Sequence, residues 1–333
     1  MTNDISNYYR PTDRTLWRAR IDGTDADLLR LHQLVRFSNA LNTDFPALLL
    51  GQKGAIIIGF RTDEGVIRNM GRVGAAEGPK AIRQAMAGLP VHFPHTSILI
   101  DAGDINCPDG NLEQAQAALG TLVAKAQSAG YRTIVLGGGH EVAYGNWSGL
   151  EHAWKGGTLG VLNYDAHLDL RDWAPGSKAT SGNSFTHMAA DLQAEGKPMH
   201  YMALGVQRMG NTQRLFDRAQ AMGAIVTNGT AFSPLRLADT IKQIDGFIEP
   251  LTALHLTICL DVFGAAFAPG VSSPNPLGLS PDANFMETLH KVLASGKVIS
   301  TDIAEMNPIY DSDSRTARLA AALAFELIHA YLV

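Results

Sequence analysis

Short apolar runs alternate with helix-compatible stretches along most of the chain. Because these runs are apolar throughout rather than at every second position, they predict a mainly parallel sheet covered by helices on both faces. A closed eight-stranded barrel also fits the number of runs, and periodicity alone does not distinguish the two. The eight runs that resemble buried strands are residues 55–60, 97–101, 133–136, 158–162, 200–206, 224–227, 254–260 and 297–301.

Three stretches between or after these runs have helical spacing. Pro79 suits the first turn of a helix that runs to Ala87. Residues 112–128 show the alanine-rich apolar spacing of a helix, and residues 316–333 predict a long C-terminal helix with one buried face. Residues 61–79 are punctuated by glycine and are predicted to form a loop.

The first 50 residues are more polar and mixed than the rest. Leucines from Leu28 onward, together with Val35, predict a helix within residues 26–41. The sequence has no repeat, low-complexity tract or convincing linker. We therefore expect an N-terminal covering segment, residues 1–50, on one α/β domain formed by residues 51–333.

Composition limits the classes of function. The 333 residues are 46% hydrophobic and 18% charged, which is ordinary for a folded soluble enzyme, and the net charge of −5 gives no general basic surface for nucleic acid or an anionic membrane. The N-terminus lacks signal-peptide features, no apolar stretch is long enough to span a bilayer, and there are two cysteines. We expect a cytoplasmic protein that acts on a small molecule; a homo-oligomer is compatible with the sequence.

Potential metal ligands follow several of the apolar runs. Asp165, His167 and Asp169 alternate directly after one run, so an extended chain would bring them to one side. The carboxyl ends of strands are where open α/β sheets build their sites. A solvated loop is the alternative for this stretch alone, and a structural histidine for His140 alone. The residues that share the strand-end position are His140, Asp165, His167, Asp169, Asp261 and Glu305.

These residues suggest metal-assisted hydrolysis. Four carboxylates and two imidazoles exceed the needs of one divalent ion, and an oxygen-rich set suits Mn²⁺ better than the thiolate-rich sets of structural zinc. Two neighbouring ions lower the pKa of a shared water. The triple glycine before His140 is also compatible with a phosphate loop, but the lysine and Ser/Thr of that motif are absent.

Five motifs in order resemble the ureohydrolases, the arginase and agmatinase superfamily. They are Gly137-Gly138-Gly139-His140-Glu141, Asp165-Ala166-His167-Leu168-Asp169, Ser181-Gly182-Asn183, Asp261 with Ala268-Pro269-Gly270, and Glu305-Met306-Asn307-Pro308. Within the superfamily the chain looks most like the formimidoylglutamase family. That closer match rests on Asp63-Glu64-Gly65, on residues 71–79, on Gly139 and on residues 311–318.

The resemblance implies a single three-layer α/β domain with a central eight-stranded, mostly parallel sheet, and it sets the barrel aside. It also implies two Mn²⁺ ions and hydroxide attack on an amidine carbon. By match, His140 holds one metal and His167 the other, Asp165 bridges them, and Asp169 and Asp261 each complete one side. The implied reaction converts N-formimidoyl-L-glutamate to L-glutamate and formamide, a step of histidine degradation.

One position departs from the family pattern. Cys259 stands where a metal-bridging carboxylate is common. A soft thiolate is poorly matched to Mn²⁺, and a neutral thiol leaves the site one negative charge short, so a ligand role for Cys259 implies a weaker or different second metal. The alternative is a small buried residue that only packs.

The expected substrate has a cationic head and two carboxylates, so its binding site must contain both negatively and positively charged groups. By resemblance Glu305 orients the head. The departing amine takes its proton from His187, from Asp169 or from solvent, and the sequence does not choose among these three. Arg72, Arg171 and Arg208 lie in loops after strands and are candidates to bind the tail, and Arg72 is favoured. Asn183 is also predicted to bind substrate. Two alternatives are a hydrolase of a guanidino substrate, such as agmatine or guanidinobutyrate, and a catalytically impaired binding protein on the same fold.

Overall fold

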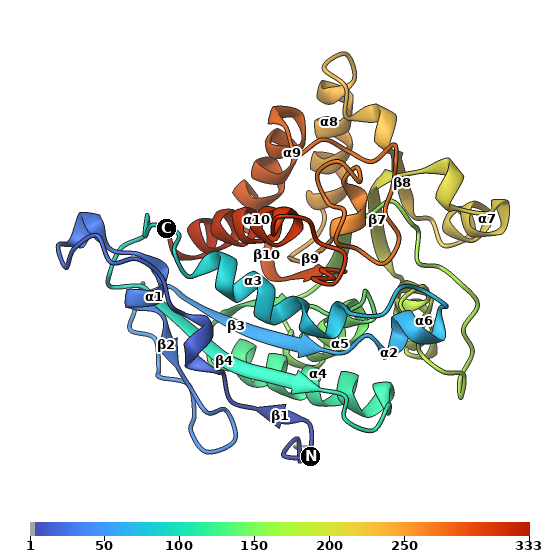
Figure 1. The fold of residues 1–333 in the computed structure, drawn as a ribbon. Coiled ribbons are helices and arrows are strands. Elements are labelled where there is room, and N and C mark those ends of the chain that lie inside the picture. Colours follow the sequence, from blue (N-terminus) through green and yellow to red (C-terminus); the bar gives the residue numbers. More distant parts are fainter. Residues whose placement is uncertain (1–3) are drawn as a thin grey trace.

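The computed structural model describes residues 4–333, and its central feature is one ten-stranded sheet (Figure 1). All strand pairs in the sheet are parallel except that of β1 with β4, and β2 pairs with β4 outside the main path. In spatial order the strands are β1 (Tyr9–Arg10), β4 (Ile98–Asn106), β3 (Gly54–Arg61), β5 (Arg132–Leu136), β10 (Val298–Ala304), β9 (Ala253–Cys259), β6 (Leu159–Tyr164), β7 (His200–Val206) and β8 (Ile225–Asn228), with β2 at Arg36–Phe37.

All eight predicted strands are present, and the prediction of a mostly parallel sheet is confirmed. The main path begins at β1 and ends at β8 without closing, so the barrel is excluded. The two strands that the sequence did not predict, β1 and β2, have two residues each and lie against β4. Strands this short carry no readable periodicity.

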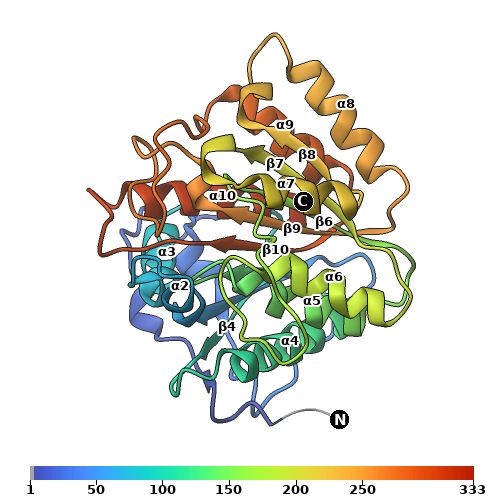
Figure 2. The ribbon, with the colours of Figure 1, turned by 90° about the vertical axis from the view of Figure 1, so that its right-hand side faces the viewer.

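Helices cover both faces of the sheet and make three layers (Figure 2). Each face has its own buried apolar side chains, because successive residues of a strand point to opposite sides. One face carries α3 (Gly78–Met86), α8 (Leu237–Ile248), α9 (Ala283–Ala294) and α10 (Arg315–Leu332). The other carries α4 (Leu112–Ser128), α5 (Val142–Ala153), α6 (Ser184–Ala194) and α7 (Gln213–Ala221).

Local sequence signals define the ends of several helices. Pro79 lies in the first turn of α3, and the Asn111 side chain accepts a hydrogen bond from the backbone N–H of Gln114 (3.3 Å) at the start of α4. The predicted helices at residues 79–87, 112–128 and 316–333 are therefore found with ends shifted by at most one residue. None of the helices in residues 4–333 is long and apolar enough to cross a membrane.

The prediction of one helix within residues 26–41 was wrong. The segment instead forms a single turn at Ala26–Leu28, the four-residue helix α1 (Leu31–Leu34) and strand β2. Val35 is extended, with φ −59° and ψ 128°, where the chain turns into β2. Strand pairing with β4 thus replaces the helix that the leucine spacing favoured locally.

The predicted loop at residues 61–79 contains a short helix. Helix α2 (Glu64–Arg68) buries Val66, and the Arg68 guanidinium pairs with Glu64 one turn away (2.9 Å) and with Glu113 at the start of α4 (2.7 Å). Five residues are too few to show a helical period in sequence. The Gly65 N–H of this helix donates to Glu141 Oε1 (3.0 Å), next to His140, where the candidate site begins.

Candidate active site and metal centre

The predicted site residues follow four adjacent strands. In the sheet order β5, β10, β9 and β6, His140 follows the first, Glu305 the second, Asp261 the third and Asp165 the fourth. Parallel strands end at the same edge, so residues 165 positions apart in sequence meet there. The backbone N–H of His140 donates to Glu305 Oε1 (3.0 Å) across this edge.

The triple glycine serves backbone packing at this edge. The Gly138 N–H donates to the Phe60 carbonyl (2.7 Å), and its own carbonyl accepts from the Glu305 N–H (2.8 Å). A Cβ on Gly138 would lie 1.7 Å from the Thr62 carbonyl oxygen. Glycine is therefore required where the ends of β3 and β10 meet the turn that presents His140.

His140 is buried and faces two carboxylates. Its Nδ1 lies 2.9 Å from Asp165 Oδ2 and 2.9 Å from Asp169 Oδ2, while its Nε2 lies 2.9 Å from the Thr257 hydroxyl. Burial by itself lowers the pKa of His140, but the charges of Asp165 and Asp169 raise it well above the usual value for imidazole. The Nδ1 side of this ring thus lies in a strongly negative environment.

A second group forms around His167. The His167 Nδ1 lies 3.1 Å from Asp261 Oδ2 and 3.6 Å from Asp165 Oδ1. Potential ligand atoms of His140, Asp165 and Cys259 lie within 4.8 Å of one another, and the same holds for Asp165, His167 and Asp261. Asp165 belongs to both groups, and this is the arrangement that a carboxylate bridging two cations requires.

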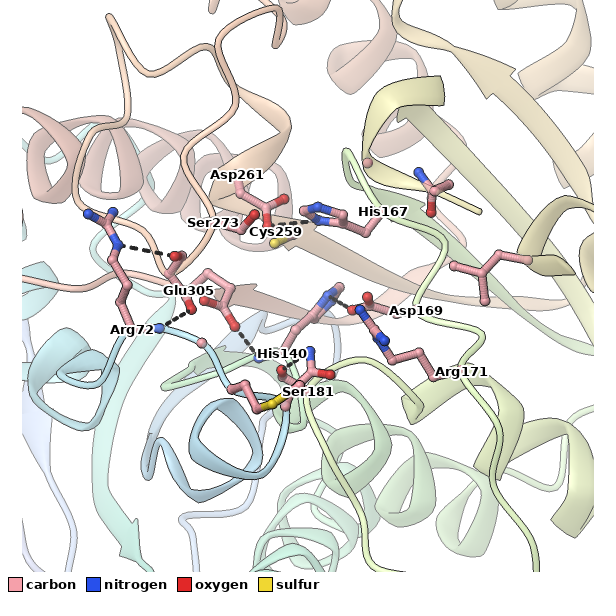
Figure 3. Close-up of a pocket in the computed structure, with 17 residues that line it drawn as sticks. Arg72, His140, His167, Asp169, Arg171, Ser181, Cys259, Asp261, Ser273 and Glu305 are labelled. Carbon is pink, nitrogen blue, oxygen red and sulfur yellow. Dashed lines mark hydrogen bonds and ion pairs between the residues drawn. The ribbon is translucent and has the colours of Figure 1, made fainter. Parts of the chain in front are cut away.

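Backbone strain accompanies two of the acidic residues. Asp169 and Glu305 have φ values of +47° and +72°, in the left-handed region that non-glycine residues seldom adopt. These conformations aim both side chains into the same space (Figure 3). Burial, together with the nearby charges of Asp261 and Glu141, raises the pKa of Glu305 to about 8.

Carboxylates outnumber cationic side chains in this cluster. Asp165, Asp169 and Asp261 pair only with the two imidazoles, and Glu305 has no ion pair among the described residues. The buried oxygens Asp261 Oδ1 and Glu305 Oε2 have no hydrogen-bond partner in residues 4–333. Buried charges are normally paired or bind metals, so this oxygen-rich set fits hard divalent cations.

The cluster opens into a cavity of about 400 Å³. His140, His167, Asp169, Cys259, Asp261 and Glu305 line its floor. Its walls contain Arg72 and Arg171, neutral polar side chains and the apolar Met70 and Leu215. The neutral polar wall residues are Asn69, Ser181, Asn211, Ser272 and Ser273.

The family model described as the Arginase family matches residues 53–330. The chain belongs to the arginase family. It is 44% identical to a formimidoylglutamase of Chromobacterium violaceum over 95% of this chain and 97% of that protein, and 40% identical to one of Geobacillus thermodenitrificans over 96% and 97%.

Solved structures of this family share the fold. A formimidoylglutamase from Bacillus subtilis matches with a TM-score of 0.77 at 21% identity, covering 96% of each chain. A Trypanosoma cruzi formiminoglutamase with Mn²⁺ matches with a TM-score of 0.73 at 23% identity, covering 89% of this chain and 99% of that one. These likenesses confirm the arginase-like three-layer architecture.

The two wall arginines of this arginase-family site differ in their partners. Arg72 Nε donates to the Ser272 carbonyl (3.1 Å), its Nη2 donates to the carbonyls of Pro269 and Val271, and its guanidinium carbon lies 3.9 Å from the centre of the Tyr310 ring. The guanidinium of Arg171 has no hydrogen bond or ion pair among the described residues. Arg171 is therefore better placed than the favoured Arg72 to meet a carboxylate in the cavity.

Two other predicted substrate-binding residues do not line the cavity in the described structure. Asn183 is buried, accepts from the Thr180 N–H (2.9 Å) and donates to the Lys178 carbonyl (3.3 Å), so its amide holds its own loop. Arg208 lies on a turn after β7, outside the cavity. We do not retain substrate binding for either residue.

His187 lies outside the cavity. Its ring is stacked between Tyr144 and Trp173, with centroid separations of 3.6 and 3.8 Å, and burial lowers its pKa to about 4. Phe185, not His187, is next to the His140 ring, at a centroid separation of 5.6 Å. The geometry gives His187 no contact through which to transfer a proton at this site.

Sequence reasoning missed two residues that hold the candidate metal ligands in place. Asn211 accepts from the Leu168 N–H (2.9 Å) and donates to the carbonyls of Ala166 (2.9 Å) and Gln207 (2.8 Å), which fixes the loop that carries His167. Thr257 contacts His140 in the same supporting way. Little in the sequence indicated their supporting roles, because a threonine inside an apolar run and an asparagine in a loop are ordinary at such positions.

Proposed function

We propose that this chain hydrolyses N-formimidoyl-L-glutamate to L-glutamate and formamide, as a step of histidine degradation. The observation that supports this best is a cavity of both signs, with a carboxylate and imidazole floor and the unpartnered guanidinium of Arg171 in its wall. The reacting group of this substrate is a cationic amidine and its tail is anionic. The names of the relatives from Chromobacterium violaceum and Geobacillus thermodenitrificans agree with this substrate.

We further propose that the site holds two Mn²⁺ ions. His140 and Asp169 would hold one ion, His167 and Asp261 the other, and Asp165 would bridge them. The partnerless oxygen of Asp261 and the excess of carboxylates support this ligand set. When bound, such ions supply Lewis acidity that lowers the pKa of a water and so provides a nucleophile at neutral pH.

Cys259 would occupy one edge of this centre. It is 1% exposed, and burial together with the charges of Asp165, Asp261 and Glu305 raises its thiol pKa well above the usual value. Its sulfur and potential ligand atoms of His140 and Asp165 lie within 4.8 Å of one another, so Cys259 would be near an ion held by those two residues. A neutral sulfur is a poor ligand for Mn²⁺, so one ion would be held less tightly than the other.

The chain's own residues then position the substrate and the proton. Glu305 is anchored through Oε1 by the His140 N–H, which leaves Oε2 to accept a hydrogen bond from the amidine head. Water adds to the formimidoyl carbon, and the bond from that carbon to the glutamate nitrogen breaks. Asp169, beside His140, would hold the proton that the departing amine takes up.

The substrate tail would lie along the wall that contains Arg171. An arginine without a protein partner can bind a carboxylate with two parallel hydrogen bonds. Asn69 and Ser181, which are hydrogen-bonded to each other (3.1 Å), and Ser273 add neutral polar groups to the cavity wall. Arg72 would shape the cavity by holding residues 269–272 rather than by touching the tail.

Product analysis tests the proposal directly. The purified chain, supplied with Mn²⁺, is assayed for formamide and glutamate from N-formimidoyl-L-glutamate, and for urea from agmatine, guanidinobutyrate and arginine. We expect formamide and glutamate in equal amounts and little urea. Urea release at comparable kcat/KM would instead identify a guanidino substrate.

A further inference from the structure

A row of buried polar side chains lies beneath His140, on the side of the ring away from the cavity. It contains Thr257 and His255 on β9, Asp302 on β10 and Asn146 on α5, all of them buried. None of the four lines the cavity. The row occupies the middle of the sheet, where apolar side chains would be the ordinary choice.

The hydrogen bonds from His140 to Thr257 and from Thr257 to Asp302 are donated in the same direction, away from the cavity. The Thr257 hydroxyl donates its single hydrogen to Asp302 Oδ1, so toward His140 it can act only as an acceptor. His140 Nε2 lies 2.9 Å from that hydroxyl and must therefore carry a hydrogen. In neutral imidazole only one nitrogen is protonated, which leaves the Nδ1 lone pair free on the side of Asp165 and Asp169.

Asp302 is itself held in place. Its Oδ2 accepts from Asn146 Nδ2 (2.9 Å) and lies 2.6 Å from His255 Nε2, while its Oδ1 accepts from Thr257. Asn146 is fixed in turn, because its Oδ1 accepts from the Ser300 hydroxyl (2.8 Å). A buried carboxylate that accepts from both Asn146 and Thr257 is a rigid acceptor.

The His140 ring has little other freedom. Its backbone N–H donates to Glu305, its carbonyl accepts from the Ser184 hydroxyl (3.1 Å), and Phe185 packs against the ring edge-on. These contacts fix the position of the residue but not which ring nitrogen carries hydrogen. Asp165 and Asp169 would attract a hydrogen to Nδ1 while no cation is bound there, whereas the contact with Thr257 favours hydrogen on Nε2 and so leaves Nδ1 available to a cation between the ring and the carboxylates.

We infer that Thr257 and Asp302 are positioning residues for the metal centre. Asp302 orients the Thr257 hydroxyl, and the hydroxyl favours the tautomer of His140 whose Nδ1 lone pair, on the side of Asp165 and Asp169, would be available to a cation. Partners of this kind typically contribute a factor of about 10–100 to metal affinity. The inference rests on the metal centre of the proposed function but does not depend on the identity of the substrate.

Metal binding by three variants tests this inference. Thr257→Val keeps the shape and removes the acceptor, Thr257→Ser keeps the hydroxyl, and Thr301→Val is the matched control. Thr301 is a buried threonine on the adjacent strand β10 whose hydroxyl pairs with Tyr331 (2.6 Å) and not with the site. The dissociation constant for Mn²⁺ is measured from the electron paramagnetic resonance signal of the free ion, and folding is followed by circular dichroism in EDTA.

We expect Thr257→Val to raise the dissociation constant of one Mn²⁺ by about 10–100-fold, while Thr257→Ser and Thr301→Val keep the wild-type value. Thr257→Val should lose at least as much thermal stability in EDTA as Thr301→Val, since it removes a donor to the buried Asp302 carboxylate, whereas Thr301→Val removes a partner of the neutral Tyr331 hydroxyl. Wild-type affinity in folded Thr257→Val, or an equal loss in Thr257→Ser, would overturn the inference. If the wild-type chain itself bound no Mn²⁺, the metal centre of the proposed function would fail as well.

Discussion

Two buried clusters of acidic side chains in this protein differ in the ion-pair and hydrogen-bond partners of their carboxylates. In the first, Arg83 is fully buried and donates to Asp101 from Nε (2.7 Å) and Nη2 (2.9 Å) and to Asp104 from Nη1 (2.6 Å). Trp17 and Thr12 each donate to Asp101 at 2.7 Å. In the second, the carboxylates of the candidate site face two imidazoles and leave oxygens of Asp261 and Glu305 without a partner in residues 4–333.

We interpret the difference as that between a structural cluster and the proposed metal site. The Arg83 cluster joins α3 to β4 and ties the segment that precedes residue 50 to the sheet, and it has no oxygen left for a ligand on Asp101. The second cluster is incomplete by itself, because its four carboxylates face only two imidazoles, and one oxygen each of Asp261 and Glu305 has no partner among the described residues. Burial of acidic residues is thus common to both, and the carboxylate oxygens left without a partner are what support a metal-binding role for the second.

The largest expected effect is on hydrolysis, when a substitution in the second cluster prevents it from binding its cations. Asp165→Asn or Asp165→Ala should lower hydrolysis by roughly a thousandfold or more, because several kcal/mol of transition-state stabilisation disappear with the ions. Mn²⁺ should raise the melting temperature of the wild type and no longer raise that of the variant. Full activity of either variant after metal removal would contradict the proposed centre.

Removing the arginine of the first cluster should instead lower the stability of the fold and leave metal binding unchanged. Arg83→Met leaves Asp101 and Asp104 buried without their cation, so we expect a loss of about 3–5 kcal/mol in the free energy of unfolding. The folded fraction should bind Mn²⁺ as the wild type does. Urea unfolding with and without Mn²⁺ measures both quantities; a change in metal affinity with unchanged stability would remove the distinction between the clusters.

The two arginines of the cavity also differ in whether protein groups already bind them: Arg72 has such partners and Arg171 has none among the described residues. Arg171→Ala should raise KM for N-formimidoyl-L-glutamate by roughly 10–100-fold, because a charge-assisted contact to the tail is lost, and should hardly affect a formimidoyl compound without carboxylates. Arg72→Ala should weaken hydrolysis of both compounds to a similar degree, since it loosens residues 269–272. Steady-state kinetics with both substrates measure these effects, and a tail-dependent effect of Arg72→Ala alone would reverse our assignment.

The smallest expected change is at Cys259. Cys259→Asp adds a hard oxygen ligand beside Asp165 and should tighten the weaker Mn²⁺ by roughly tenfold. Metal stoichiometry and the Mn²⁺ dependence of formamide release are measured for both forms, with Cys107→Asp as a control at the other, half-buried cysteine. Unchanged occupancy in Cys259→Asp would show that residue 259 does not reach the metal centre.

Local patterns in the sequence were sufficient to predict the main strands and to place the candidate metal ligands at the ends of those strands. Apolar runs predicted all eight main strands because buried strands must be apolar on both faces. Residues that follow such runs, among them His140 and Asp165, meet for a topological reason, since parallel strands end at one edge. The short pieces β1, β2 and α2 lay beyond this method, because two to five residues carry no period.

The sequence by itself determined the layered fold, the family motifs and the strand-end residues, since each depends on neighbours in the chain or on strand direction. Only the tertiary structure decided which charges have partners. Arg72 donates to carbonyls about 200 positions away, whereas Arg171 meets none, and Thr257 reaches His140 across 117 positions. Hydrogen bonds and ion pairs depend on distances of about 3 Å between side chains, and residue spacing along a chain does not specify such distances.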